Sequence, residues 1–239
     1  MLKMKMNLFS AKSAVKIFCG QYPALFYTMY GLKPINRMLF VNQSTQLVIE
    51  GFPRSANTFA VLAFQYLQSK EIKIAHHLHV PSQIFRAVKW HIPTIVLIRN
   101  PIDAVASLLV RNPKLSITQS LKNYISFYER IREYRYSYIV ASFDEVVQDY
   151  SQVIKKLNNK FDTNFYAKEI SASAKKNIFN QIDKLSCYFV SGEESKAARP
   201  SVQKKELKQI IRQEIHQKKH QSLVVKSEYI FQEFTADKN

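Results

Sequence analysis

The run Thr94-Ile95-Val96-Leu97-Ile98 places five apolar or β-branched residues in succession. It lacks the alternation expected of a strand with one face in water, and is typical of a strand buried on both faces at the centre of a parallel sheet. Other runs that fit strands lie on either side of it, at Gln46–Glu50, Lys73–His76 and Tyr138–Ser142. The chain therefore predicts a mostly parallel sheet.

The segments between these strands fit helices, at Asn57–Gln68, Pro81–Val88, Pro101–Leu109, Ile117–Glu133 and Asp149–Lys160. This alternation predicts an α/β protein with three layers, α/β/α, around a mostly parallel central sheet. We expect residues 1–239 to form a single domain with its core at about 46–165. Residues 166–239 are expected to be a mostly helical, basic C-terminal part, and the N-terminal segment is expected to be helical as well.

The charge balance is strongly basic. Lys and Arg number 35 against 18 Asp and Glu, which gives a net charge of +17 and an isoelectric point near 9.8. Such a charge favours anionic partners without choosing among them, and no dedicated nucleic-acid motif is present, so no specific nucleic acid is expected. Two cysteines, Cys19 and Cys187, are too few for a disulfide framework and indicate a reducing, cytoplasmic compartment.

The segment from Tyr22 to Phe40 is rich in aromatic and apolar residues. No apolar run approaches the roughly 20 residues that cross a bilayer. Two interpretations remain, namely that the segment packs on the domain, which we favour, or that it makes a peripheral contact with a membrane surface.

The segment Gly51-Phe52-Pro53-Arg54-Ser55-Ala56-Asn57-Thr58-Phe59 joins a predicted strand to a predicted helix. Such a loop collects free backbone N–H groups and the positive end of a helix dipole at one point, which suits a phosphate or sulfate group. Its spacing is close to that of the loop G-x-x-x-x-G-K-[ST], but Ala56 and Asn57 replace Gly and Lys, and the cation is Arg54. The alternative is a structural turn in which Ser55 or Asn57 caps the helix.

A second candidate site follows the central strand, where Arg99-Asn100-Pro101 leads into a helix that carries Ser107. Asn100 and Pro101 fit the start of that helix. Arg99 lies at the end of a buried strand and needs a partner there. A phosphate bound by Arg99 and Ser107 would supply it, and a carboxylate within the protein is the alternative.

Three of the six histidines lie in Ala75-His76-His77-Leu78-His79-Val80-Pro81. No cysteine or suitably spaced carboxylate accompanies them, so a zinc site is disfavoured and no metal is expected. A histidine after the end of a strand suits a general base, because its pKa lies near working pH.

Together these motifs resemble those of the sulfotransferases that use 3′-phosphoadenosine 5′-phosphosulfate (PAPS). The loop of residues 51–59 is similar to their 5′-phosphosulfate loop, and Arg99 with Ser107, eight residues apart, is similar to their 3′-phosphate motif. His79-Val80-Pro81 stands in the place of their H-x-P motif, and Ser142-Phe143-Asp144-Glu145-Val146 resembles a later segment. The resemblance covers about residues 46–165.

The resemblance implies a P-loop-like fold and transfer of a sulfuryl group from PAPS to a hydroxyl or amine, by in-line displacement and without a metal. It implies His79 as the base and Arg54 as the cation that stabilises the leaving phosphate. Further residues are expected to hold the nucleotide donor, namely Ser55, Ala56, Asn57, Thr58, Phe59, Arg99, Ser107 and Phe143. The hydroxyl acceptor (a carbohydrate, a lipid headgroup or a small molecule) is left open.

The chain departs from the family pattern at three points. Ala56 replaces a loop glycine, Phe143 stands where many relatives have Tyr, and the glycine-rich C-terminal motif is absent, since Gly192 is the last glycine. Arg199 is a candidate to contact the 3′-phosphate in place of that motif. Two other functions stay open. One is a P-loop kinase or NTPase, disfavoured because Asn57 replaces the lysine, and the other is a non-catalytic basic nucleotide-binding protein.

Overall fold

The computed structural model describes residues 14–32, 39–189 and 202–236. Its strands are β1 (Leu47–Gly51), β2 (Ile74–His76), β3 (Thr94–Ile98) and β4 (Ile139–Ser142). The helices of the first half are α2 (Pro23–Tyr30), α4 (Asn57–Leu67), α5 (Pro81–Lys89), α6 (Pro101–Arg111) and α7 (Ile117–Ile131). The later elements are η1 (Arg132–Ser137), α8 (Phe143–Gln148), α9 (Tyr150–Phe161), α10 (Ala172–Phe189), α11 (Val202–Ile215), η3 (Lys218–His220) and α12 (Gln221–Thr235).

The four strands form one sheet in the order β2-β1-β3-β4, and every neighbouring pair is parallel. The register places Ile49 opposite both His76 and Ile95, and Ile95 opposite Ile139. All five residues of β1 and of β3 are buried, which explains why the sequence of β3 shows no alternation. Since the strands are parallel, their carboxyl ends meet at one edge of the sheet.

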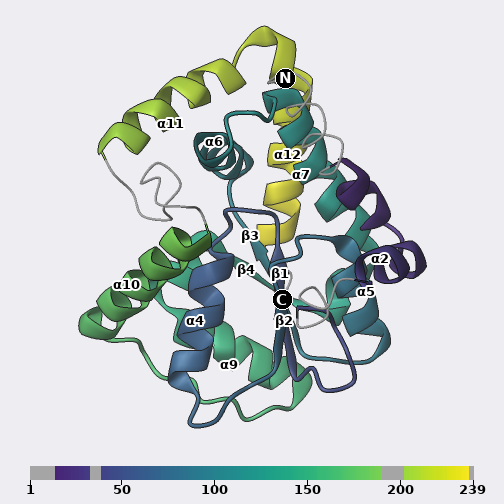
Figure 1. The fold of residues 1–239 in the computed structure, drawn as a ribbon, viewed down its shortest axis with the longest axis vertical. Helices are drawn as coiled ribbons and strands as arrows, with labels where there is room; N and C mark the ends of the chain where they lie inside the picture. The colour runs from purple at the N-terminus through teal and green to yellow at the C-terminus, as the bar shows by residue number, and fades with distance from the viewer. Residues whose placement is uncertain (1–13, 33–38, 190–201, 237–239) are drawn as a thin grey trace.

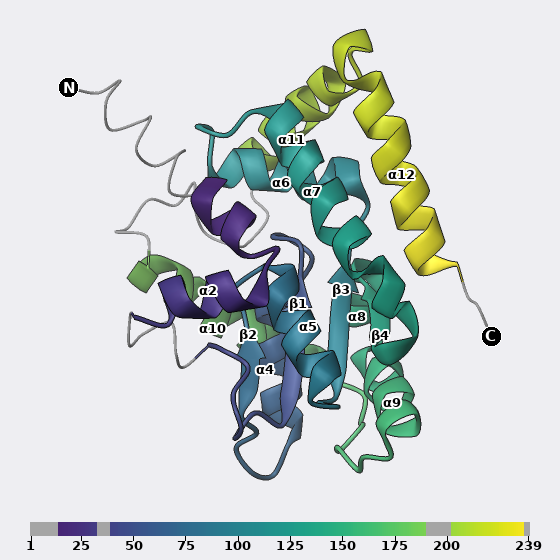
Figure 2. The same cartoon turned by 90° about the vertical axis from the view of Figure 1, so that its right-hand side faces the viewer.

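Helices cover both faces of the sheet, which confirms the predicted α/β/α layers (Figures 1 and 2). In Figure 1 the helices α4, α9 and α10 lie to the left of the strands, while α5 and α2 lie to the right. Turning the molecule brings α5 and α7 in front of the sheet in Figure 2. The helix α12 packs along α7, and α11 packs on α6.

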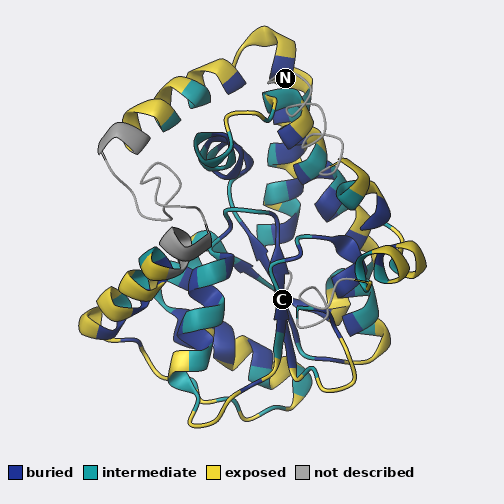
Figure 3. Cartoon of the chain, viewed as in Figure 1, coloured by how far each residue is buried: buried dark blue, intermediate teal, exposed yellow. Residues whose placement is uncertain are grey.

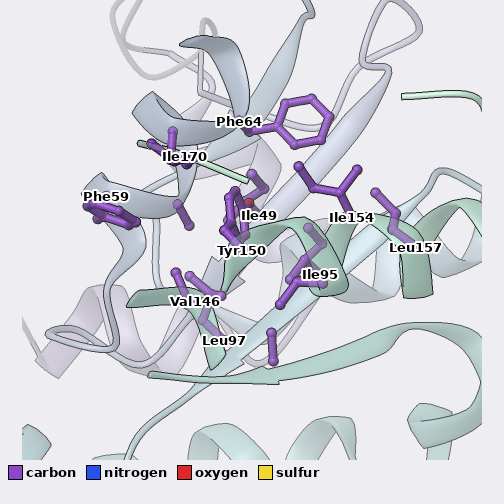
Figure 4. Close-up of a cluster of buried hydrophobic side chains, with 14 of the residues drawn as sticks. Ile49, Phe59, Phe64, Ile95, Leu97, Val146, Tyr150, Ile154, Leu157 and Ile170 are labelled. Carbon is purple, nitrogen blue, oxygen red and sulfur yellow. The ribbon is translucent and has the colours of Figure 1, made fainter. Parts of the chain in front are cut away.

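The first core cluster lies between the sheet and the layer of α4, α9 and α10 (Figure 4). Ile49 and Ile95 of the sheet are fully buried there, together with Ile154 of α9. A second cluster fills the opposite face, where Val96 and Ile98 pack with α5, α6, α7 and α12. The alternate side chains of β3 thus supply both cores, as a doubly covered strand requires.

The predicted strands agree with the observed ones to within one residue at each end. The predicted helices differ from the observed ones by at most two residues. Asp149, for example, lies just outside α9 as its N-cap, because its carboxylate accepts a hydrogen bond from the amide of Ser151. The predicted helical C-terminal part is confirmed by α10, α11 and α12.

The segment before the sheet packs on the domain with one of its sides, as favoured from the sequence. Phe26 of α2 is fully buried and stacks on Tyr30 at 5.1 Å between ring centroids. Gly20 accepts hydrogen bonds from both the amide and the hydroxyl of Ser82 at the start of α5. Within the described ranges no helix combines the length and the apolar character needed to cross a membrane.

Candidate functional site

The loop after β1 begins at Gly51, where β1 and β3 approach closely. A Cβ atom at Gly51 would lie 2.2 Å from the carbonyl oxygen of Leu97, so only glycine fits. The loop is held at both ends, since the amide of Phe52 donates to the hydroxyl of Tyr128 and the side chain of Asn57 donates to the carbonyl of Phe52. The sheet therefore fixes where the loop starts and how it returns to α4.

The N-terminus of α4 has no side-chain cap. Its N-cap residue is Ala56, and neither Ser55 nor Asn57 accepts a hydrogen bond from the first turn, so the predicted alternative of a capped structural turn is wrong. Arg54 and Ala56 have φ angles of 72° and 68°. Non-glycine residues rarely adopt this left-handed region, and backbone turns of this type direct successive N–H groups toward one side, where they form an anion-binding hollow.

Two segments far apart in sequence meet at Arg54. The Nε of Arg54 donates a hydrogen bond to the hydroxyl of Ser107 on α6, at 3.0 Å. The Nη1 of Arg99 donates to the carbonyl of Arg54, also at 3.0 Å. The guanidinium of Arg99 in turn lies 3.8 Å from the ring centre of Phe143. The structure thus brings together four of the residues that the sequence predicted for donor binding.

This cluster brings two arginines together without a direct ion pair. Burial lowers the pKa of Arg99, and the charges of Asp103 and Asp144 act in the opposite direction. Burial first, and then the charges of Arg111 and Arg99, lower the pKa of Arg54 to about 10. None of the ion pairs among the described residues includes Arg54 or Arg99. The Nε of Arg99 is buried without a hydrogen-bond partner. Because a buried donor of this kind is costly to leave unpaired, the cluster is suited to an anion.

His79 lies at the same edge of the sheet, and its tautomer follows from its contacts. Its Nδ1 is 2.7 Å from the carbonyl oxygen of Gly51, which can only accept, so Nδ1 carries the proton and Nε2 bears a free lone pair. Burial, followed by the charge of Lys16, lowers the pKa of His79 to about 3. The ring is therefore neutral at pH 7, and a negative ligand nearby would raise its basicity.

Glu50 positions the segment that carries His79. This fully buried carboxylate accepts hydrogen bonds from the amides of Leu78 and His79, at 2.8 and 2.9 Å. Burial raises the pKa of Glu50 to about 7, and the two amides and the charge of Lys16 act in the opposite direction. Sequence reasoning missed this residue, although a carboxylate at the end of an apolar strand run is unusual enough to be a signal.

A chain of hydrogen bonds connects the other two histidines to the loop. The Nε2 of His77 lies 3.0 Å from the hydroxyl of Thr58, and its Nδ1 lies 2.6 Å from the Nδ1 of His76. Burial is the main cause that lowers the pKa of His76 to about 4 and of His77 to about 2, so both rings are neutral. In the described part of the chain no group of three potential metal ligands is placed to hold an ion.

The remaining predicted residues take other positions. Ser55 is buried and Phe59 packs in the first core, 5.3 Å from the ring of Phe179, so the group that Phe59 offers the loop is its backbone amide. Asn57 uses its side chain to hold the loop. Arg199, the candidate contact for a 3′-phosphate, lies outside the described residues.

The helix α11 places two cations, Lys208 and Arg212, beside the Arg99–Ser107 motif. Sequence reasoning did not single out these two residues. Asp103 of α6 pairs with Arg212 and, at 3.2 Å, with Lys208. Burial acts to raise the pKa of Asp103, but the hydrogen bonds and charges of these two cations lower it overall. A cavity of about 380 Å³ adjoins this group, lined by Asn100, Ile102, Asp103, Arg212, His216 and Glu228. The i, i+4 spacing of Lys208 and Arg212 within a basic stretch was the available signal.

The fold and this site define a three-layer α/β protein with an uncapped strand–loop–helix and two arginines at the carboxyl edge of its sheet. Comparison with protein-family models and with curated protein sequences finds no match. Among solved structures, the chain is similar to the mouse sulfotransferase SULT7A1 in complex with PAP, with a TM-score of 0.41 and 10% sequence identity. That match covers 82% of this chain and 93% of the mouse chain.

Proposed function

We propose that this chain is a sulfotransferase that transfers the sulfuryl group of PAPS to a hydroxyl or amine acceptor. The observation that carries the proposal is the meeting of Arg54, Arg99 and Ser107 beside the uncapped start of α4. The cluster offers cationic and hydroxyl donors from two motifs, and no carboxylate of the described residues forms an ion pair with either arginine. It therefore suits a ligand that carries two separate anionic groups, as the 5′-phosphosulfate and 3′-phosphate of PAPS do.

In the proposed complex the loop amides of residues 54–59 and the hydroxyl of Thr58 hold the 5′-phosphosulfate. Arg99 and Ser107 hold the 3′-phosphate, and Phe143 supports the guanidinium of Arg99. Arg54 uses only Nε for its bond to Ser107, which leaves its Nη groups for the phosphate that departs. Charge builds on that phosphate in a loose transition state, so a cation placed there lowers the barrier.

The acceptor is activated by His79. Its Nε2 takes the proton from the acceptor hydroxyl while the acceptor oxygen bonds to sulfur and the bond between sulfur and the phosphate oxygen breaks. The products are the sulfated acceptor, 3′-phosphoadenosine 5′-phosphate (PAP) and a protonated His79, which releases its proton to water. Glu50 holds the backbone of His79 in place throughout.

The direct test is transfer of labelled sulfur from PAPS to an acceptor library, with mass analysis of the product. A sulfated product that is lost in a His79→Asn variant supports the proposal. Stronger transfer of the γ-phosphoryl group from ATP than of the sulfuryl group from PAPS would instead support the kinase alternative. We also propose that the protein acts in the cytoplasm and that the transfer needs no metal ion.

A non-catalytic nucleotide-binding protein is the second candidate, and one observation favours it. Ala56 adopts φ = 68°, a conformation that the loop glycine of the related motif would take without strain. The methyl group of Ala56 packs against the first core cluster, however, so it does not fill the anion-binding hollow. This second candidate predicts PAP binding without a sulfated product from any acceptor in the library.

A further inference from the structure

The N-terminal segment carries a row of exposed apolar side chains. Six large apolar residues from residue 15 to residue 32 are exposed, with fractions from 38% at Leu25 to 76% at Leu32, and a turn at residues 20–22 separates the helical residues 14–19 from α2. We call them the apolar stripe, and its members are Val15, Phe18, Tyr22, Leu25, Met29 and Leu32. Exposed residues along the outer side of α2 are visible in Figure 3.

The apolar stripe faces away from the domain, because the opposite side of the segment packs on the domain. Phe26 is fully buried against Tyr30 and Phe40, and the hydroxyl of Tyr27 donates to the side chain of Gln83 at 2.7 Å. The helix α2 is thus apolar on both sides. A helix with apolar residues on both sides is normally covered by apolar groups on both sides, so the stripe is expected to contact an apolar surface outside the domain.

The N-terminal sequence that carries the stripe has charges of one sign. Residues 1–49 contain no Asp or Glu, and they contain six Lys and Arg, namely Lys3, Lys5, Lys12, Lys16, Lys33 and Arg37. The guanidinium of Arg130 lies 5.6 Å from the ring centre of Tyr22, at the stripe itself. Arg130 also lines a hollow of about 630 Å³ with Pro23, Arg86, Lys89 and Trp90, in which Glu133 is an acidic member.

The combination of exposed apolar side chains with nearby cations favours one kind of binding partner. An anionic bilayer surface takes apolar and aromatic side chains at the boundary between headgroups and acyl chains, while it attracts the cations beside them. A protein partner or a second copy of this chain would have to bring acidic groups to the same place. This chain is itself basic, with a charge of +17, which disfavours self-association through a surface where Lys89 and Arg130 outnumber the acidic Glu133.

We infer that the apolar stripe docks the protein on the surface of an anionic lipid bilayer. The stripe enters the interfacial layer, and Lys89 and Arg130 contact lipid phosphates at its side. The inference does not depend on the proposed sulfotransferase activity, because none of these residues belongs to the donor site.

The test is co-sedimentation of the full chain with vesicles of phosphatidylcholine alone and of phosphatidylcholine with phosphatidylglycerol. We expect at least tenfold tighter binding to the anionic vesicles. The double variant Phe18→Ser/Leu25→Ser should lose on the order of tenfold or more, because each apolar side chain contributes independently to partitioning. The matched control is Tyr136→Ser/Tyr229→Ser, which changes two exposed side chains elsewhere and should bind like the wild type.

Trp90 reports which face binds. It is the single tryptophan of the chain, it is 42% exposed, and it lines the same hollow as Pro23 of α2. A blue shift of its fluorescence on addition of anionic vesicles is expected. Binding without a shift, unchanged binding of the stripe variant, or a dimer in light scattering that only the stripe variant abolishes would overturn the inference.

Discussion

The side chain of Arg54 donates a hydrogen bond to the hydroxyl of Ser107, and this bond joins the loop after β1 to the second turn of α6. The two motifs to which these residues belong lie 53 positions apart in the chain. Each motif alone fits a structural role. Their meeting at one edge of the sheet does not follow from helix or strand stability, because it concentrates positive charge.

Ser107→Ala tests whether the second motif distinguishes PAP from ADP. At a concentration one hundred times its Kd, a ligand stabilises the native state by about 2.7 kcal/mol, which for a chain of this size raises Tm by roughly 5–10 °C. We expect such a shift with PAP and little with ADP in the wild type, measured without Mg²⁺. The variant should lose about tenfold in PAP affinity.

The control for this experiment is Ser222→Ala, which removes an exposed hydroxyl from α12. It should leave both nucleotides unaffected. Equal stabilisation of the wild type by ADP and PAP would remove Arg99 and Ser107 from 3′-phosphate binding.

His79→Asn tests the proposed base. Asn is chosen because His79 has φ = 55°, a conformation that Asn tolerates better than Ala does. We expect kcat for sulfuryl transfer to fall by roughly 10²–10⁴ while PAP affinity stays within twofold of the wild type. His91→Asn is the matched control, since His91 also has φ = 55° but is exposed and away from the site. Full activity in His79→Asn would mean that another group accepts the proton.

Thr58 and His77 allow a test of hydrogen-bond direction. If Thr58 donates its proton to the donor's phosphate, it must accept from Nε2–H of His77, and His77 must then accept at Nδ1 from His76. Nitrogen NMR of the PAP complex should therefore show the Nε2–H tautomer for His77 and the Nδ1–H tautomer for His76. Thr58→Val should lower PAP affinity roughly tenfold, and Thr58→Ser should restore it. The reverse tautomers would exclude this role for Thr58.

The three half-buried histidines His76, His77 and His79 predict a loss of stability in acid. Their pKa values are lowered in the folded state, so below about pH 6.5 the unfolded chain binds more protons and stability falls as the pH falls. Glu50, whose pKa is raised to about 7, contributes the opposite slope between about pH 4.5 and 7. The three histidines together outweigh Glu50, so the free energy of unfolding is expected to fall as the pH falls.

Urea unfolding between pH 7 and pH 5 measures how the free energy of unfolding changes with pH. His77→Gln should reduce this slope by at most ~1.4 kcal/mol per pH unit, the effect of one proton. Glu50→Gln should make it steeper, because the offsetting carboxyl is gone. A slope that is unchanged in both variants would show that these groups titrate normally.

Ala56→Gly tests the cost of the left-handed residue. Glycine removes a strain of about 1–2 kcal/mol but loses roughly 0.5–1 kcal/mol through the greater freedom of the unfolded chain. We expect Tm to stay level or rise by a few degrees, and Ala56→Val to lower it. PAP affinity should change less than twofold in Ala56→Gly, since the methyl packs on the core rather than in the loop. A tenfold gain in affinity would show that the methyl obstructs the donor.

Most of the sheet could be predicted from local sequence. β3 is buried on both faces, and burial alone requires the unbroken apolar run that marks it. The helix that begins at Pro101 could also be predicted from sequence, because Asn100 caps it by accepting hydrogen bonds from the amides of Ile102 and Asp103. These features depend on neighbours within a few residues, which is the range over which a sequence pattern carries information.

The finer contacts of the site could not be predicted in this way. The hydrogen bonds of Glu50 to the amides of Leu78 and His79 depend on how the loop after β2 returns beside β1. The pairing of Lys208 and Arg212 with Asp103 depends on α11 crossing α6, more than one hundred residues later in the chain. The sequence marks these residues as unusual, but their partners are set by the packing of whole elements, which no local pattern specifies.

Four of the residues with left-handed backbone, Arg54, Ala56, His77 and His79, lie together at the carboxyl edge of the sheet. Each costs about 1–3 kcal/mol unless its surroundings hold it in place. The amides of Leu78 and His79 are held by Glu50, whereas the loop around Arg54 and Ala56 is expected to open locally before the strands do and to exchange its amides sooner. An anion that bridges these loop amides would close the same loop, so the donor would complete the fold at this edge as well as take part in the reaction.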